Sequence, residues 1–145
     1  MSKFRYIMWD WNGTLLDDLK ANFDTINKLL SDRNLPQMKS LEEYRSLFCF
    51  PVIGFYEKTG FDLENEKFEN IAKDYVREYY SRFFECELFS ESEAILRYIL
   101  TSGREQLIVS ATEQESLLKQ VEEFEIDHLF TEILGMSDIY ARSKV

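Results

Sequence analysis

The sequence has little of what would build a metal–thiolate site, a disulfide framework or a basic binding surface. It contains one histidine and two cysteines, Cys49 and Cys86, without paired-cysteine spacing, which excludes a zinc site and a disulfide scaffold. Only 17 Lys and Arg residues oppose 27 Asp and Glu residues, giving a net charge of −10. This balance argues against a nucleic-acid partner and against docking on an anionic membrane, because both need clustered positive charge.

Long hydrophobic runs are also missing. The longest uncharged apolar run, residues 47–56, is too short to span a bilayer and is interrupted by Pro51 and Gly54. The N-terminal residues lack the apolar stretch and the small-residue cleavage site of a signal peptide. We therefore expect a soluble protein of the reducing cytoplasm. The hydrophobic content of 45% is still sufficient for a packed core.

Three short apolar runs read as buried strands, at residues 5–10, 106–110 and 132–135. Amphipathic patterns between them predict helices, the strongest of which covers residues 65–85. Capping-box patterns that begin at Ser40, Ser90 and Thr112 mark three further helix starts.

The order of these elements predicts the fold class. Strands and helices alternate after residue 90, which favours right-handed crossovers and a parallel sheet. The helical stretch at 18–89 is too long for one crossover and is interpreted as an insert. We expect an α/β protein with a Rossmann-like parallel sheet core at 1–17 and 90–145, and a small helical cap at 18–89.

Two strand ends carry side chains that can do chemistry. The first is Asp10, which is followed by Asn12 and Thr14, and the second is Ser110 with Ala111. Parallel sheets bind ligands at the carboxyl ends of their strands, where a carboxylate can act as a nucleophile. A hydroxyl that is followed by a helix N-terminus favours anion binding. Together these features suggest attack on a phosphoryl group.

These residues resemble a known family. The run Asp10-x-Asn12-Gly13-Thr14-Leu15 is similar to the first motif of the haloacid dehalogenase superfamily, usually Asp-x-Asp-Gly-Thr in its phosphatases. Ser110 is similar to the second motif, and Lys144 stands where the third motif has its lysine. The helical insert resembles the small cap of phosphoglycolate-phosphatase-like members.

The resemblance implies a Mg²⁺-dependent phosphatase of small phosphate monoesters. Asp10 would be the nucleophile that forms an aspartyl-phosphate, and it would bind Mg²⁺ together with the main-chain carbonyl of Asn12. Thr14 would orient the loop. The phosphoryl oxygens would be bound by Ser110, Ala111 and Lys144, the last of which would also neutralise charge on Asp10.

The chain departs from the family pattern in two places. Asn12 replaces the Asp that serves as general acid and base, and an amide cannot exchange a proton. The fourth motif, which supplies further metal-binding carboxylates, is expected beyond Val145, so that the sheet is incomplete at the C-terminus. The chain is then a truncated product or a fragment, or a second copy covers the open sheet edge as a homo-oligomer.

These departures leave two alternative functions open. One is a catalytically impaired domain that binds a phosphate ligand or a protein. The other is carbon–halogen or phosphonate hydrolysis, because a halide leaving group needs no proton.

Overall fold

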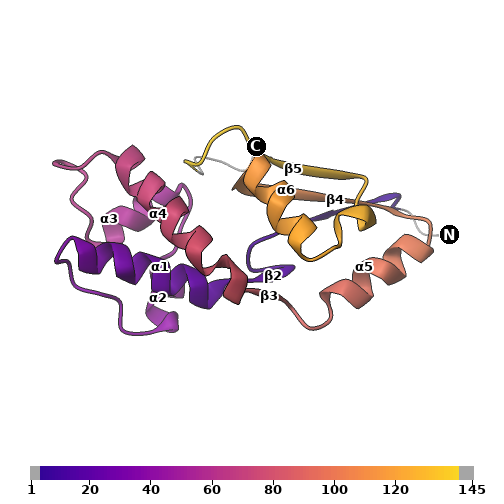
Figure 1. The fold of residues 1–145 in the computed structure, drawn as a ribbon, viewed down its shortest axis with the longest axis horizontal. Coiled ribbons are helices and arrows are strands. Elements are labelled where there is room, and N and C mark those ends of the chain that lie inside the picture. Colours follow the sequence, from indigo (N-terminus) through magenta and orange to yellow (C-terminus); the bar gives the residue numbers. More distant parts are fainter. Residues whose placement is uncertain (1–3, 141–145) are drawn as a thin grey trace. The chain divides into compact units, whose positions relative to one another are not determined.

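The computed structural model describes residues 4–140, which form two compact units (Figure 1). The α/β unit contains residues 4–17 and Glu87–Asp138, and the helical unit contains Asp18–Cys86 with residues 139–140. The helical unit thus ends at Cys86 and not at residue 89 as the sequence suggested. Of the three residues 87–89 that belong to the α/β unit instead, Glu87–Leu88 form a short strand.

The α/β unit is built on a parallel three-stranded sheet. Its strands are β1 (Tyr6–Trp9), β4 (Glu105–Glu113) and β5 (Glu132–Met136), in the order β1-β4-β5. The predicted parallel sheet is therefore confirmed. Alternate residues of β4 from Gln106 to Ser110 are buried, as expected for a strand with one face against helices.

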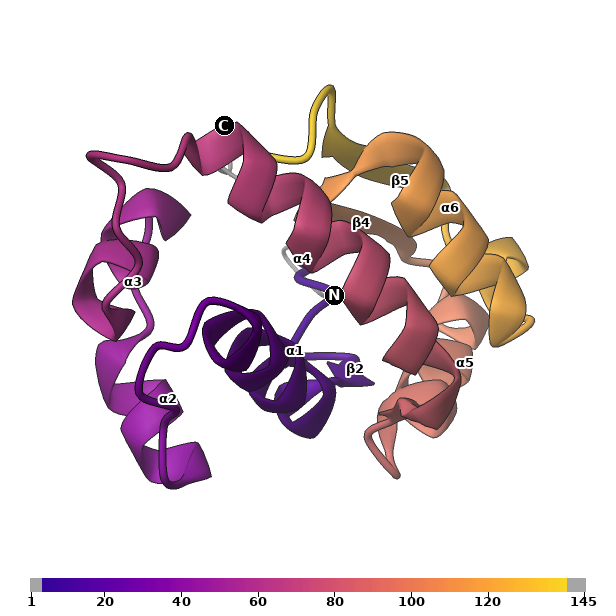
Figure 2. The same cartoon turned by 60° about the vertical axis from the view of Figure 1, so that its left-hand side comes forward.

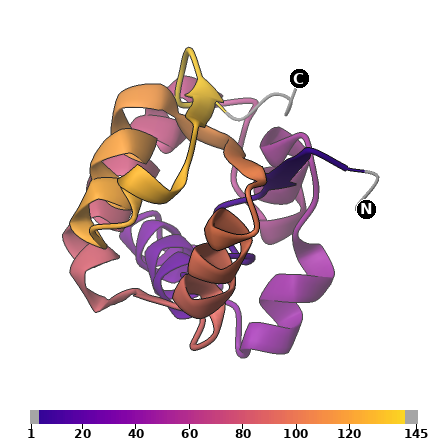
Figure 3. The ribbon, with the colours of Figure 1, turned by 90° about the vertical axis from the view of Figure 1, so that its right-hand side faces the viewer.

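Helices α5 (Ser92–Thr101) and α6 (Gln114–Glu123) lie on the same side of the three strands (Figure 3). Helix α5 packs on β4, and α6 packs on both β4 and β5. On the sheet itself, Met8 is 73% exposed and Leu134 is 44% exposed. Within residues 4–140, β1 pairs only with β4, so its outer edge has no strand partner there.

A second sheet, not predicted from the sequence, joins the two ends of the α/β unit that flank the helical unit. Strands β2 (Leu16–Asp17) and β3 (Glu87–Leu88) pair antiparallel, with Leu16 opposite Leu88. Two-residue strands give no periodic signal, because at least four residues are needed for alternation to be visible. This pair makes the chain leave and re-enter the α/β unit at neighbouring points.

The helical unit consists of four α-helices and a short 3-10 turn (Figure 2). The helices are α1 (Leu19–Asp32), α2 (Leu41–Leu47), α3 (Val52–Thr59) and α4 (Phe68–Arg82), and the turn is η1 (Phe83–Glu85). The helix expected at residues 65–85 is thus confirmed as α4 and η1.

Helix α1 packs against α2 and α4, and α2 packs against α3. The apolar faces of these helices and their connections close a common core. Its buried members are Ile26, Leu29, Leu30, Met38, Tyr44, Phe55, Tyr56, Phe61 and Ile71.

Of the three predicted capping boxes, the structure forms one. Ser40 Oγ accepts a hydrogen bond from the Glu43 N–H at 3.1 Å and caps α2. The box at Ser90 is wrong, because α5 begins at Ser92 and its N-cap residue Glu91 makes no side-chain cap bond. The box at Thr112 is also wrong, since Thr112 lies inside β4.

Candidate active site

The tips of β1 and β4 bring the two predicted motifs together. Trp9 lies opposite Ile108 in the parallel register, so Asp10 follows β1 at the level where β4 continues into Ser110. The two strands run in the same direction, and their carboxyl ends therefore share one edge of the sheet. Residues about a hundred positions apart in sequence meet at this edge.

Asp10 is half-buried at the β1 tip, where its Oδ1 accepts a hydrogen bond from the Trp11 N–H at 2.9 Å. The same loop is tightened by the Trp11 carbonyl, which accepts from the N–H groups of Thr14, Leu15 and Leu16 at 3.0–3.2 Å. Thr14 is exposed and contributes through this main-chain contact. The loop therefore holds the Asp10 carboxylate at the strand end.

A glycine in the left-handed conformation allows the tight turn of this loop. Gly13 has φ of +72° and donates its N–H to the Leu16 carbonyl at 2.9 Å. Residues with a Cβ rarely adopt this φ. This explains why a glycine follows Asn12, since Asn-Gly is a pair typical of turns.

The buried Trp11 side chain anchors the loop. Its side chain is fully buried, its ring meets Phe124 edge-on at 6.1 Å between centroids, and its Nε1–H donates to Gln120 Oε1 at 2.9 Å. Gln120 and Phe124 come from α6 and the residue that ends it. The residue between Asp10 and Asn12 is thus fixed in the core of the α/β unit.

Asn12 is joined to the β4 tip by two hydroxyl groups. Thr112 Oγ1 donates to Asn12 Oδ1 at 2.8 Å, and Ser110 Oγ lies 3.4 Å from the same oxygen. Ser110 is 3% exposed, and its Oγ accepts from the Thr112 N–H at 3.1 Å. The predicted residues Asn12 and Ser110 are therefore in one hydrogen-bonded set, and Thr112 completes it.

Sequence reasoning assigned Thr112 to a helix cap and missed this contact. The register between β4 and β5 shifts between Val109 and Glu113. Val109 pairs with Leu134 and Glu113 with Met136, so β4 advances four residues while β5 advances two. Such a bulge redirects side chains at the end of a strand. The sequence contained one indication of this contact: Ser110 and Thr112 are two residues apart, which places both side chains on one face of an extended strand.

The N-terminus of α6 differs from the expected anion site. The Glu113 side chain caps it by accepting hydrogen bonds from the N–H groups of Glu115 and Ser116 at 3.0 Å and 2.9 Å. Burial raises the pKa of the Glu113 carboxyl, but the hydrogen bonds from Ser116 and Glu115 outweigh burial and lower it. These N–H groups already bind an anionic side chain, so the expectation that this helix end contributes free donors is wrong for these two groups.

Ala111 lies half-buried in the bulged segment between Ser110 and Thr112. Lys144, the predicted third-motif lysine, lies outside the described residues.

The oxygen donors at the β1 tip fit Mg²⁺ in chemical type. A carboxylate at Asp10 and a main-chain carbonyl at Asn12 are the hard ligands that this ion takes, usually with several waters and substrate phosphate oxygens. Within residues 4–140 no group of three or more His, Cys, Asp or Glu side chains is arranged to hold a metal. The described residues therefore offer part of a ligand set.

Gly135 is placed where the end of β5 touches the bulge. A Cβ at this position would lie 2.6 Å from the Thr112 carbonyl oxygen and 2.9 Å from Gln114 Cα, both main-chain atoms. The Gly135 N–H also donates to Gln114 Oε1 at 2.6 Å. The close approach of two backbones requires the absence of a side chain.

We expect Gly135→Ala to destabilise the α/β unit by ~1–3 kcal/mol, because backbone must shift to relieve the clash. Chemical denaturation followed by tryptophan fluorescence measures this loss. Gly54→Ala in α3 is the matched control, since its Cβ would meet only Cys49 Sγ at 3.4 Å. Equal stability of Gly135→Ala and wild type would contradict the close approach.

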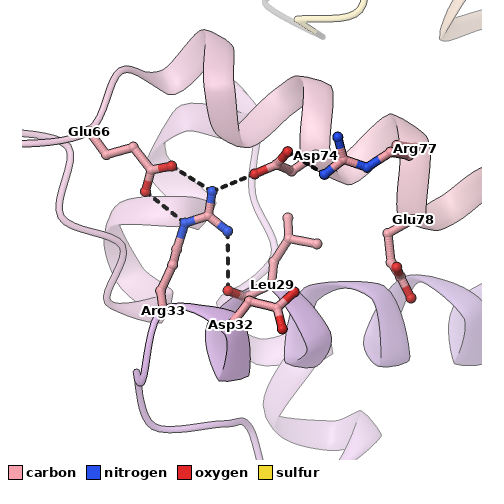
Figure 4. Close-up of a pocket in the computed structure, with 7 residues that line it drawn as sticks. All are labelled: Leu29, Asp32, Arg33, Glu66, Asp74, Arg77 and Glu78. Atoms are coloured by element: carbon pink, nitrogen blue, oxygen red, sulfur yellow. Dashed lines mark hydrogen bonds and ion pairs between the residues drawn. The ribbon is translucent and has the colours of Figure 1, made fainter.

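A pocket of about 300 Å³ lies in the helical unit and contains none of the predicted site residues (Figure 4). It surrounds the Arg33 guanidinium, whose Nε donates to Glu66 at 2.7 Å and whose Nη2 donates to Asp74 at 2.8 Å. Asp74 also accepts from Arg77 at 2.7 Å. The ion pairs in its lining join Arg33, the residue that follows α1, to Glu66 before α4 and to Asp74 in α4.

This network is expected to make the stability of the helical unit depend on pH in the acid range. The hydrogen bond from Arg33 lowers the pKa of the Asp74 carboxyl, burial opposes this effect, and Arg77 adds to it. A carboxyl whose pKa is lower in the folded state stabilises the fold above its unfolded pKa, and this stabilisation is lost as the pH falls through the folded pKa.

We therefore expect Arg33→Met to be less stable than wild type near pH 7, and the difference to shrink as the pH falls below about 4. Thermal unfolding between pH 7 and pH 2.5 measures the difference. Arg77→Met is the control, because the Arg77 side chain is 78% exposed and its pair contributes little. A gap that is constant over the whole pH range would contradict the ion-pair explanation.

The fold agrees with comparisons to known proteins. A search of curated proteins finds no match. Among solved structures, a predicted phosphoglycolate phosphatase from Haemophilus somnus superposes with a TM-score of 0.73 at 24% identity, over 95% of this chain and 66% of that one. A haloacid dehalogenase-like family protein from Streptococcus pneumoniae superposes with a TM-score of 0.80 at 19% identity, over 94% of this chain and 63% of that one.

A predicted phosphatase from Clostridium acetobutylicum gives a TM-score of 0.76 at 24% identity, over 94% of this chain and 62% of that one. The chain thus spans slightly less than two thirds of the length of these three relatives. No helix within residues 4–140 combines the length and the apolar character that crossing a bilayer requires.

The model of the haloacid dehalogenase-like hydrolase family matches residues 7–144, which include the loop after β1, the β4 tip and the helical unit between them. This match covers nearly the whole chain, and the protein belongs to the haloacid dehalogenase-like hydrolase family.

Proposed function

We propose that the protein is a Mg²⁺-dependent phosphatase of small phosphate monoesters, with Asp10 as the nucleophile and the helical unit as its cap. The observation that carries this proposal is the Asp10 carboxylate at the β1 tip, next to the hydrogen-bonded set of Asn12, Ser110 and Thr112. A carboxylate held at such a tip can attack phosphorus and form an aspartyl-phosphate.

Each of these residues has a role in the proposed reaction. The Asp10 carboxylate attacks while its other oxygen, hydrogen-bonded to the Trp11 N–H, stays oriented by the loop. The Ser110 hydroxyl would turn to a phosphoryl oxygen, with Ala111 and Lys144 completing the phosphate contacts. Asp10 and the Asn12 carbonyl would hold Mg²⁺, which supplies charge neutralisation to the phosphoryl oxygens when bound.

Hydrolysis of 4-nitrophenyl phosphate by the purified chain, with Mg²⁺ and with chelator, tests this function. Its nitrophenolate departs as a stable anion, so the reaction does not depend on a proton donor at position 12. We expect turnover that requires Mg²⁺. A folded protein without turnover under either condition would contradict the proposal.

A second candidate is a domain that binds phosphate without turnover, and Asn12 favours it. The amide oxygen of Asn12 is fixed by Thr112, and an amide offers no proton for either half of the reaction. This candidate predicts binding of inorganic phosphate by calorimetry together with no hydrolysis, even in Asn12→Asp. Activity in that variant would exclude the candidate.

A further inference from the structure

The groups at the strand tips determine whether a leaving group can be protonated. Besides Asp10, the acids at the carboxyl ends of strands in the described part of the α/β unit are Asp17 in β2, Glu113 in β4 and Asp138 after β5. The Glu113 carboxylate accepts three hydrogen bonds, from two N–H groups and from Ser116 Oγ, within its own helix cap. Asp138 follows β5, which β4 separates from β1. Glu113 ends the strand next to β1 but is held in its own helix cap, and Asp138 is separated from Asp10 by a strand. Asp17 is exposed in the second sheet.

The side chains that hydrogen bonds join at the tips of β1 and β4, within the described residues, are an amide and two hydroxyls. Asn12 Oδ1 accepts from Thr112 Oγ1 at 2.8 Å, which fixes the amide plane and directs its oxygen toward β4. The NH₂ end of the amide therefore points the other way. An amide NH₂ can donate hydrogen bonds, but it cannot transfer a proton at neutral pH.

We propose that Asn12, held in this orientation by Thr112, restricts the substrates to phosphoryl compounds with weakly basic leaving groups. These are acyl phosphates, phosphoanhydrides, and aryl or enol phosphates, as distinct from alkyl phosphates. The inference rests on the proposed function and adds its substrate class. Thr112 acts through Asn12 and is a positioning residue.

The chemistry balances without a proton donor. A carboxylate oxygen of Asp10 forms a bond to phosphorus, and the bond from phosphorus to the leaving oxygen breaks. The leaving group keeps the electron pair and departs as an anion. Water then attacks phosphorus, the Asp10–phosphorus bond breaks to restore the carboxylate, and the proton of the water is taken up by the released phosphate.

A substrate series tests the leaving-group requirement directly. Acetyl phosphate, 4-nitrophenyl phosphate, phenyl phosphate and glycerol phosphate have leaving groups of increasing basicity, from a carboxylate to an alkoxide. We expect kcat/KM of the wild-type chain to fall along this series by ~10²–10⁴-fold, the usual contribution of general acid catalysis. Spontaneous hydrolysis of acetyl phosphate is subtracted with Asp10→Asn.

The matched variant is Asn12→Asp, which has the same shape and adds a carboxyl that Thr112 can hold by the same hydrogen bond. We expect the ratio of kcat/KM for glycerol phosphate to kcat/KM for acetyl phosphate to rise in this variant by on the order of 10²-fold or more. Equal wild-type kcat/KM with acetyl phosphate and glycerol phosphate would overturn the inference. So would an Asn12→Asp variant in which the ratio of the two kcat/KM values does not rise.

Thr112 is tested by two variants. Thr112→Val removes the hydroxyl and is expected to lower kcat by ~10–10²-fold with little change in KM, because the amide is no longer oriented. Thr112→Ser keeps the hydroxyl and should retain most of the activity. Equal loss in both variants, at unchanged stability, would show that the hydroxyl does not position Asn12.

Failure of the inference is distinguishable from failure of the proposed function. Absence of turnover with every substrate, acetyl phosphate included, overturns the proposed phosphatase and the substrate class with it. Turnover of all substrates at similar rates leaves the phosphatase in place and overturns only the substrate class, since it requires a proton donor other than Asn12.

Discussion

Asp10→Asn is expected to lower kcat for 4-nitrophenyl phosphate by on the order of 10⁴-fold or more, because it removes the proposed nucleophile. The fold should persist, since Asn Oδ1 can accept the hydrogen bond that the Trp11 N–H now donates at 2.9 Å. The variant therefore separates chemistry from structure. Initial rates with Mg²⁺ and a thermal unfolding curve measure both.

The same variant tests the covalent intermediate. Acid quenching of wild type during turnover of acetyl phosphate should trap a phosphoryl group on the protein, detectable by mass spectrometry, and Asp10→Asn should trap none. Asp127→Asn is the matched control, because Asp127 is an exposed acid of the 3-10 turn η2 (Asp127–Leu129). Turnover in Asp10→Asn above a tenth of the wild-type value would place the nucleophile elsewhere.

Trp11→Ala should cause the largest loss of stability among single substitutions near the site, ~3–5 kcal/mol. Trp11 is fully buried, and its removal leaves a cavity beside Phe124. It also removes the donor to Gln120, a side chain that is 2% exposed, and an unpaired buried amide adds to the cost. Since domains are stable by only about 5–15 kcal/mol, a large part of the total is lost.

Urea denaturation followed by the fluorescence of the remaining Trp9 measures this effect. Trp9→Ala is the matched control, because Trp9 is half-buried and also donates to a glutamine, Gln106, at 3.0 Å. We expect the control to lose clearly less stability. Equal losses in the two variants would mean that Trp11 does not anchor the loop more firmly than a strand residue.

Activity in the Trp11 variants links the core to the site. Trp11→Phe keeps an aromatic ring at the position and should fold, yet it loses the bond to Gln120. If the buried side chain sets the direction of Asp10 and Asn12, kcat should fall in Trp11→Phe while the protein remains folded.

The amphipathic patterns predicted the helices well. The apolar stripe of α4 was visible because helical periodicity is a local property of the chain. The three strands of the main sheet and their parallel order followed from the alternation of elements. Two predicted capping boxes are wrong because tertiary contacts engage their residues otherwise. In the box at Ser90, Ser92 Oγ donates to the Leu15 carbonyl, and in the box at Thr112 the first residue belongs to β4.

The sequence by itself determined the fold class, the roles proposed for Asp10 and Ser110, and the departure at Asn12. The tertiary structure decided which groups meet. The Thr112–Asn12 hydrogen bond depends on the parallel register of β1 and β4 and on the bulge after Val109. The need for glycine at position 135 depends on a backbone from another element. Periodicity carries no information on such contacts, because they form only when distant segments pair in one register.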